Sequence, residues 1–235
     1  MRIVFMGTPQ FAVPSLKILL DNNYDVITIV TAPDKKKGRG QIVAVSDVKK
    51  FAMENKLRIL QPEKLKEKKF ISDITSLAPE LIIVVAFRIL PKEIFTIPSY
   101  GSFNLHASLL PKYRGAAPIN YALINGETET GVTTFFVKEK VDTGNIILQE
   151  KIEISDDDDA GTIHDKLSHL GAQTVLQTVM LIEKGNISLK TQNETAASPA
   201  PKIFKEDCLI NWNQESSKIN NFVRGLSPKP AAFTT

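Results

Sequence analysis

Two polar side chains two positions apart, Asn104 and His106, are the residues of this chain best suited to chemistry. They lie in a short apolar stretch that predicts a strand. A loop rich in Pro and Gly follows this strand and ends at Gly115. Alternate residues of a strand point to the same face, so the carboxamide and the imidazole are expected side by side at the strand end. Acyl transfer needs such a pair, because one group must hold a developing oxyanion and another must handle a proton.

Each histidine could have a purely structural role. Taken alone, His106 could equally be a hydrogen-bonded core residue, and it is the neighbouring Asn104 that favours catalysis. His164 and His169 lie on a predicted helix at a spacing of five, which does not bring them to one face. No H-E-x-x-H pattern or carboxylate cluster accompanies any histidine, so the sequence gives no support for a metal site. Asp142, in an Asp-Thr-Gly turn, is on pattern alone one turn aspartate among several.

A glycine-flanked loop between Pro33 and Gly40 is strongly basic. Its four basic residues are Lys35, Lys36, Lys37 and Arg39. A charge run of this kind usually marks a solvated loop, and contact with a phosphate backbone is the alternative. The pattern alone favours the solvated loop.

The turn Gly7-Thr8-Pro9-Gln10-Phe11 follows the first predicted strand, where a dinucleotide-binding turn would stand. It lacks the G-x-G-x-x-G pattern, because Pro9 and Phe11 occupy positions that should allow close approach of a pyrophosphate. This argues against a nicotinamide or flavin enzyme.

The composition restricts the class of protein. The chain has 235 residues, 43% of them hydrophobic, and a net charge of +3, which is too small to indicate nucleic-acid binding by itself. Cys208 is the only cysteine, so an intrachain disulfide is excluded and a reducing cytoplasm is expected. The longest apolar run, Leu81 to Phe87, is too short to span a bilayer, and we expect neither a membrane segment nor a signal peptide.

The first half of the chain alternates between predicted strands and helices. Strands are expected at Arg2–Met6, Val26–Val30, Arg58–Leu60, Leu81–Val85 and Ser102–His106, and helices from Pro14, near Asp47–Asn55 and over Leu65–Leu77. This order predicts an α/β fold of Rossmann-like type, a mostly parallel sheet with helices on both faces. Ligand sites then belong at the carboxyl ends of the strands.

The second half follows a different pattern. Gly131–Val137 and Ile146–Ile154 are rich in β-forming residues and predict a hairpin, with Asp142 in its turn. The acidic run Asp156–Asp159 precedes a long predicted helix, Ala160 to about Glu183, and is interpreted as structural, because acidic residues favour a helix N-terminus. The polar stretch Thr191–Pro201, which contains two prolines, follows this helix and is interpreted as a linker.

Together these motifs resemble the methionyl-tRNA formyltransferase family, over residues from Met1 to about Pro230. The matching parts are Phe5-Met6-Gly7-Thr8-Pro9 with Phe11-Ala12, Pro33-Asp34 with Gly38-Arg39-Gly40, Asn104-Leu105-His106, Ser108-Leu109-Leu110-Pro111, Arg114-Gly115-Ala116-Ala117-Pro118, Glu129-Thr130-Gly131-Val132-Thr133 and Asp142-Thr143-Gly144. The Asn-x-His, Ser-Leu-Leu-Pro and Asp-x-Gly parts are shared with other transferases that use 10-formyltetrahydrofolate. The Gly-Thr-Pro and Gly-Arg-Gly parts are more particular to the tRNA family.

The resemblance implies a role for each matched position. The catalytic residues would be Asn104, His106 and Asp142. The residues that hold the tetrahydrofolate moiety would be Ser108, Leu109, Leu110 and Pro111. The residues that approach the tRNA acceptor end would be Arg39, Lys37, Lys36 and Lys35, which reverses the solvated interpretation of that loop.

The activity that the resemblance implies is transfer of a formyl group from 10-formyltetrahydrofolate to the α-amino group of methionyl-initiator tRNA, in the cytoplasm, by a monomer without a metal. It further implies a catalytic domain over 1–190, a linker over 191–202 and the start of a truncated C-terminal tRNA-binding domain over 203–235. Two alternatives stay open at this point. One is a formyltransferase acting on a sugar nucleotide or another small amine, and the other is a folate- or tRNA-binding fragment without turnover.

One segment departs from the family pattern. Many members carry a Gly after the aromatic residue in the part that matches Ala86 to Pro91, and this chain has Phe87-Arg88 there. In related transferases this segment lines the pterin pocket with backbone groups, so individual folate contacts are not assigned to it.

Overall fold

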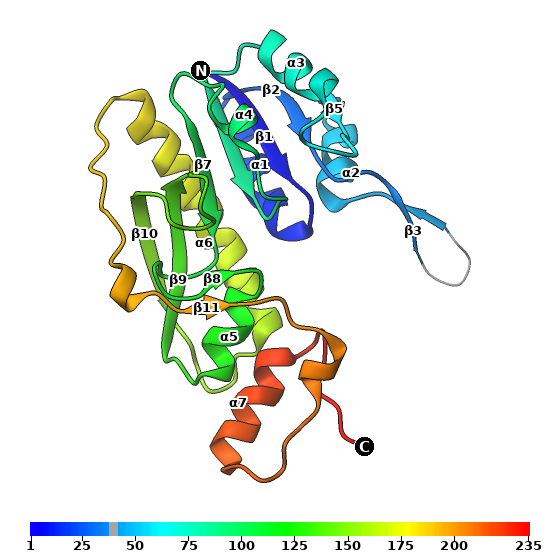
Figure 1. The fold of residues 1–235 in the computed structure, drawn as a ribbon, viewed down its shortest axis with the longest axis vertical. Coiled ribbons are helices and arrows are strands. Elements are labelled where there is room, and N and C mark those ends of the chain that lie inside the picture. The colour runs from blue at the N-terminus through cyan, green and yellow to red at the C-terminus, as the bar shows by residue number, and fades with distance from the viewer. Residues whose placement is uncertain (38–41) are drawn as a thin grey trace.

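A seven-stranded sheet forms the centre of the computed structural model, which describes residues 1–37 and 42–235 (Figure 1). The strand order is β10-β9-β7-β6-β1-β2-β5. The strands are β1 (Arg2–Gly7), β2 (Asp25–Val30), β5 (Ile59–Leu60), β6 (Leu81–Val85), β7 (Ser102–His106), β9 (Glu129–Phe136) and β10 (Ile146–Glu153). The strands from β5 to β7 pair in parallel, whereas β9 and β10 pair antiparallel with their neighbours. The predicted α/β fold with a mostly parallel sheet is confirmed.

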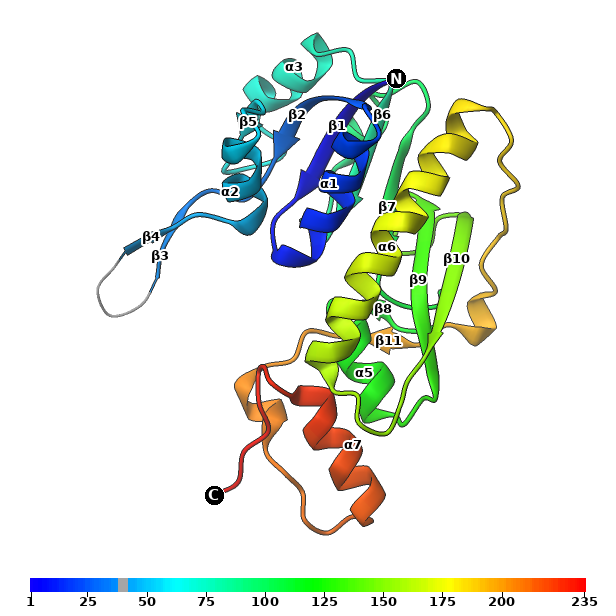
Figure 2. The same ribbon diagram turned by 180° about the vertical axis from the view of Figure 1, so that it is seen from behind.

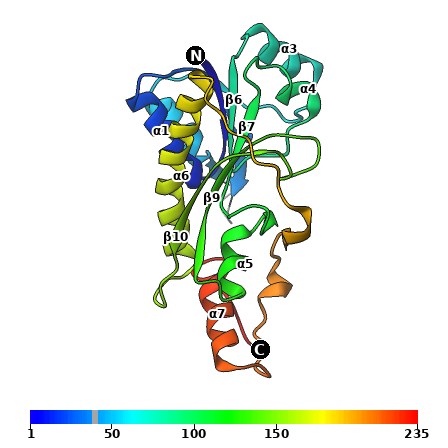
Figure 3. The same ribbon diagram turned by 90° about the vertical axis from the view of Figure 1, so that its left-hand side faces the viewer.

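Helices cover both faces of this sheet. On one face lie α1 (Val13–Asp21), α2 (Asp47–Glu54) and α6 (Ala160–Glu183), and on the other lie α3 (Lys68–Ser76) and α4 (Lys92–Phe95), as Figure 3 shows for α1 and α6 against α3 and α4. Side chains of β1 alternate between the two cores: Ile3 belongs to the first cluster and Val4 to the second. All five residues of β6 are buried, as expected for a central strand of a sheet covered on both faces.

Helix α6 crosses the sheet beside α1 and passes closely over β7 (Figure 2). A Cβ on Gly171 would come within 2.6 Å of Leu105 Cδ2, so a larger residue there would require the Leu105 side chain to shift. Since Leu105 faces α6, the side chains of Asn104 and His106 on either side of it face the opposite side of the sheet. The tight crossing therefore fixes the strand that carries both candidate catalytic residues.

The acidic run before α6 starts the helix. Asp159 is its N-cap, and the Asp159 Oδ1 accepts a hydrogen bond of 2.9 Å from the backbone N–H of Thr162. Burial opposes the charge of Asp158, but hydrogen bonds from Lys166, Ser155 and Thr162 outweigh it and hold the pKa of this carboxyl well below its usual range. The structural interpretation of the run is confirmed.

Several short elements lacked a sequence signal. They are β3 (Lys35–Lys37), β4 (Ile42–Ala44), β8 (Arg114–Gly115), β11 (Pro199–Ala200), α5 (Pro118–Ile124), α7 (Ser216–Leu226) and three 3₁₀ turns at Gln10–Ala12, Glu194–Ala196 and Lys205–Cys208. Strands β3 and β4 form an antiparallel arm that extends away from the sheet (Figure 1). Helix α7 packs on α5, where Asn120 Nδ2 donates a hydrogen bond of 2.7 Å to the carbonyl of Gly225. None of the helices in residues 1–37 and 42–235 is both long and apolar enough to cross a bilayer.

Candidate active site

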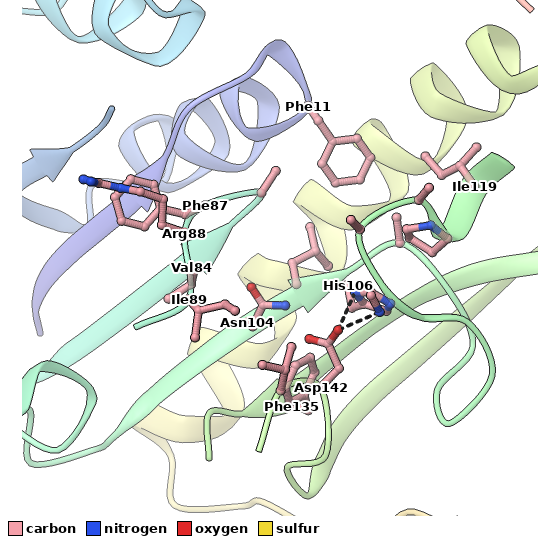
Figure 4. Close-up of a pocket in the computed structure, with 18 of the residues that line it drawn as sticks. Phe11, Val84, Phe87, Arg88, Ile89, Asn104, His106, Ile119, Phe135 and Asp142 are labelled. Carbon is pink, nitrogen blue, oxygen red and sulfur yellow. Dashed lines mark hydrogen bonds and ion pairs between the residues drawn. The ribbon is translucent and has the colours of Figure 1, made fainter. Parts of the chain in front are cut away.

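A cavity of about 710 Å³ opens at the carboxyl ends of the central strands, where a sheet of this type is expected to bind ligands. Its size is typical of a pocket for a small organic molecule. Strand β6 contributes Val84 and strand β7 contributes Asn104 and His106, while Phe135 and Asp142 come from β9 and the segment after it (Figure 4).

The three residues expected to be catalytic meet in this cavity. Asn104 and His106 project from the end of β7, and Asp142 comes from the turn between β9 and β10. Nδ1 of His106 lies 3.9 Å from Oδ2 of Asp142, and both side chains are largely buried (Figure 4). The same Oδ2 accepts a hydrogen bond of 2.9 Å from the backbone N–H of Gly115, which fixes the carboxylate in place. The gap to the imidazole is within reach of a small shift or a bridging water.

The tautomer of His106 follows from its partners. Nε2 lies 2.8 Å from the carbonyl oxygen of Tyr113, and because a carbonyl only accepts, Nε2 must carry the hydrogen. Tyr113 is itself held by its side chain, whose hydroxyl donates to Glu127 at 2.7 Å. Burial, together with the Glu127 contact, raises the pKa of Tyr113 to about 12. With Nε2 bonded to Tyr113, the other ring nitrogen, Nδ1, faces Asp142 and the cavity.

The carboxamide of Asn104 is available to a ligand. Its backbone is paired with Val84 of β6 on one side and Phe135 of β9 on the other, so its position is fixed by the sheet. Within the part of the chain that the structure describes, no protein group makes a hydrogen bond to its side chain, which lines the cavity. Two N–H donors are thus directed into the cavity beside the imidazole.

The turn that carries Asp142 is tightly constrained. Asp142 has φ of 54°, a left-handed conformation that Asp tolerates better than most residues. A Cβ on Gly144 would overlap the carbonyl oxygen of Phe136, so the third position of the Asp-x-Gly motif must be glycine. The motif is therefore explained by the close return of the chain against β9.

The four residues expected to hold folate lie beside the cavity and do not line it. Ser108 Oγ donates to the carbonyl of Lys112 at 2.6 Å, and the carbonyl of Ser108 accepts from Thr133 Oγ1 at 2.6 Å. Leu110 is 3% exposed and packs on Phe135 and Ile146. Leu109 and Pro111 are half-buried in the same turn. Leu110 therefore supports the cavity through Phe135, and direct contact of the four residues with folate stays a prediction.

The Phe87-Arg88 departure has a structural role. The guanidinium of Arg88 lies 5.2 Å from the centre of the Phe87 ring and donates to the carbonyls of Pro62 and Glu63 at 2.8 and 2.9 Å. Burial lowers the pKa of Arg88. Both residues line the cavity together with Ala86, whose φ is 47°. Arg88 thus ties this cavity wall to the loop after β5.

The basic loop is described only in part. Lys35 is exposed and begins β3, and the backbones of Lys36 and Lys37 continue that strand. Arg39 lies outside the described residues. The base of the arm is anchored by Asp34, which pairs with Lys49 and accepts a hydrogen bond of 2.9 Å from Gln61.

One wall of the cavity was missed by the sequence reasoning. Phe11, Ile119 and His164 line it, with the rings of Phe11 and His164 in an edge-to-face arrangement 5.3 Å apart. The signal lies in the Gly7-Thr8-Pro9-Gln10-Phe11 turn, which matches the family pattern but suggests no role for Phe11 in the site. In residues 1–37 and 42–235, no group of three or more His, Cys, Asp or Glu side chains is arranged to hold a metal ion.

The chain belongs to the formyl transferase family. A sequence model of that family matches residues 1–179, and a model of the formyl transferase C-terminal domain matches residues 202–235. The resemblance stated from the motifs is confirmed.

Among its relatives are enzymes named methionyl-tRNA formyltransferase. The chain is 51% identical to the one from Bacteroides fragilis over 238 residues, an alignment that covers 100% of this chain and 74% of that protein. It is also 51% identical to the one from Flavobacterium johnsoniae, covering 99% of this chain and 74% of that protein.

Solved structures of sugar formyltransferases share the fold. A sugar 3N-formyl transferase crystallised in the presence of dTDP and 5-N-formyl-THF is 25% identical, with a TM-score of 0.73 over 96% of this chain and 78% of that one. A sugar N-formyltransferase from a Shewanella species is 16% identical, with a TM-score of 0.75 over 100% of this chain and 92% of that one.

Proposed function

We propose that this chain transfers the formyl group of 10-formyltetrahydrofolate to the α-amino group of methionyl-initiator tRNA, and so supports the initiation of translation. The observation that supports the reaction is the meeting of Asn104, His106 and Asp142 in one cavity. The acceptor is supported by the relatives, since those named methionyl-tRNA formyltransferase are 51% identical and the sugar enzyme is 25% identical.

The nucleophile is the amine of the methionyl ester. An α-amino group of pKa about 7.7–8.0 is partly neutral at physiological pH, so attack needs no strong base beforehand. A C–N bond forms between this nitrogen and the formyl carbon, and the carbonyl oxygen gains negative charge. The N–H donors of Asn104 stabilise that oxyanion, because they face the cavity and make no hydrogen bond to the residues that the structure describes.

His106 then moves a proton from the incoming to the leaving nitrogen. Its Nδ1 accepts the proton of the attacking amine, while Nε2–H stays hydrogen-bonded to Tyr113. The imidazolium that results faces the carboxylate of Asp142 at 3.9 Å, which stabilises the positive charge. Nδ1 returns the proton to the folate nitrogen as the bond between that nitrogen and the formyl carbon breaks. The products are formylmethionyl-tRNA and tetrahydrofolate.

The cavity offers two walls for the two substrates. We assign the pterin end of the folate to the wall from Ala86 to Leu90, with Ser108–Pro111 as its support. The methionyl side chain is assigned to the apolar wall at Phe11 and Ile119. The two reacting groups would then meet at Asn104.

The proposal also assigns the domains of the chain and the residues that contact tRNA. Catalysis belongs to residues 1–190, followed by the linker 191–202 and by residues 203–235 of the C-terminal tRNA-binding domain, a range that agrees with the family match at 202–235. The arm that begins at Lys35, and the basic loop through Arg39, would approach the negatively charged acceptor end.

The experiment that tests this function compares acceptors. The chain is incubated with 10-formyltetrahydrofolate and either methionyl-initiator tRNA or an amino-sugar nucleotide. We expect formylation of the charged tRNA only. Formylation of the sugar nucleotide alone would overturn the acceptor, and absence of transfer to either would overturn the enzymatic function.

A further inference from the structure

The linker follows α6 and pairs with β8, next to the candidate active site. Its residues Pro199 and Ala200 pair in parallel with Arg114 and Gly115 of β8. Gly115 is the residue whose N–H holds the carboxylate of Asp142. The support of that carboxylate thus depends on a strand pair to which the linker contributes one half.

Gln192 is the part of the linker that contacts the Asp142 turn directly. The residue is 6% exposed. Its Nε2 donates to the carbonyl of Asp142 at 2.9 Å and to the carbonyl of Gly144 at 2.8 Å. Its Oε1 accepts from Arg114, at 3.1 Å from Nε and 2.7 Å from the terminal nitrogen. All four hydrogen-bonding positions of the carboxamide are therefore used inside the protein.

Ion pairs surround the hydrogen bonds of Gln192 and form one network with them. Arg114 pairs with Glu194 at 2.7 Å, and Lys140, two residues before Asp142, lies 3.4 Å from the same carboxylate. These hydrogen bonds and ion pairs connect both ends of the Asp142 turn to the linker. The buried part of the network is the Gln192 carboxamide, whose hydrogen-bonding positions are all used, and such a group holds its partners in one arrangement.

We propose that Gln192 is a positioning residue for the transfer reaction, which holds Asp142 at its working distance from His106 so that the linker completes the active site. Two contacts fix the aspartate: Gln192 binds the backbone carbonyl of Asp142, and the Gly115 N–H binds its side chain. Without the two donated hydrogen bonds, the carbonyls of Asp142 and Gly144 lose their partner. The turn then relaxes, and the carboxylate moves relative to the imidazole. The inference rests on the proposed function.

The test uses two variants that separate the two sides of the carboxamide. Gln192→Met removes all four hydrogen bonds at similar size. Gln192→Glu keeps the acceptor for Arg114 and replaces the two donors by a carboxylate oxygen facing two carbonyls. Gln173→Met, at an exposed position on α6, is the matched control. For each variant, single-turnover formyl transfer to saturating methionyl-initiator tRNA and the affinity for a folate analogue are measured.

We expect both Gln192 variants to lower the single-turnover rate by about 10²-fold, the cost of misplacing a catalytic group by about an ångström. The affinity for the folate analogue stays within about twofold, and Gln173→Met behaves as the unsubstituted chain. If Gln192→Met does not fold, Gln192→Glu alone decides. A normal rate in Gln192→Glu, or a loss that appears only in folate affinity, overturns the inference.

A double substitution distinguishes positioning from general damage. If Gln192 acts through Asp142, adding Gln192→Glu to Asp142→Asn lowers the rate by less than about threefold further, because the two losses are not additive. Full additivity would overturn the inference. Failure of the proposed function is recognised separately, since the unsubstituted chain would then not formylate methionyl-tRNA at all.

Discussion

Replacing Asn104 with Ala tests the oxyanion role most directly. The side chain makes no hydrogen bond to the described part of the protein, and its backbone stays paired with Val84 and Phe135, so truncation leaves no buried group without a partner. The free energy of unfolding should change by less than about 1 kcal/mol, which corresponds to a shift of at most about 2–4 °C in Tm for a chain of this size.

The loss in the transition state is much larger. Removing one oxyanion donor typically costs about 2.7–4 kcal/mol, or about 10²–10³ in kcat. The neutral formyl oxygen of the bound substrate gains less from the same donor, about 1 kcal/mol, so folate affinity should fall by no more than about fivefold. Asn104→Asp lacks the same donors and should be slower still, because it also places a second negative charge in the cavity beside Asp142.

The assay measures single-turnover formyl transfer with enzyme in excess over methionyl-tRNA, alongside folate-analogue binding and thermal unfolding. A rate for Asn104→Ala within threefold of the unsubstituted chain would remove Asn104 from the chemistry. A large loss of folate affinity at an unchanged transfer rate would instead make it a binding residue.

Three further substitutions test other parts of the structure. Gly144→Ala should lower single-turnover transfer by about 10²-fold, because the added Cβ overlaps the carbonyl of Phe136 and displaces the turn that carries Asp142; unchanged transfer would show that the turn tolerates a side chain. Asp158→Ala should lower the free energy of unfolding by about 1.5–3 kcal/mol, since it removes the charged hydrogen bonds to Lys166. The folded-state pKa of Asp158 is depressed, so this stability is present above the unfolded pKa of about 4 and is lost as pH falls further; urea unfolding at pH 7 and pH 3 should give a smaller difference at pH 3. Arg39→Ala should raise the KM for tRNA and reduce the slope of the logarithm of the tRNA-binding constant against log salt concentration by about 0.7–0.9. An unchanged slope would mean that the basic loop is a solvated loop without a role in tRNA binding.

The sequence predicted the elements with strong local signals. Ser102–His106 was expected as a strand and is β7 residue for residue, and the long helix from Ala160 to Glu183 is α6. Helix α3 begins at Lys68, three residues after the expected Leu65, because Glu67 in extended conformation forms its N-cap. Helices α4, α5 and α7 were not expected: α4 has only four residues, and α5 and α7 are short and packed on each other.

The arrangement of the site depends on contacts distant in sequence. Asn104 and His106 share a strand, so their proximity could be inferred from a period of two. The position of Asp142 depends on the pairing of β7 with β9 and on the constrained turn that follows, neither of which local spacing encodes. Gln192 lies in a polar segment that was interpreted as a linker, and its burial results from partners about 50 and 80 residues away.

The hydrogen bond between His106 Nε2–H and the Tyr113 carbonyl leaves Nδ1 as the ring nitrogen that can take up and release a proton. In the proposed reaction, the hydrogen that departs from the amine and the one that arrives at the folate nitrogen must then occupy the same atom in succession. The ring regains its starting charge within each turnover. His106 therefore returns to its starting protonation state without exchanging a proton with bulk solvent between cycles.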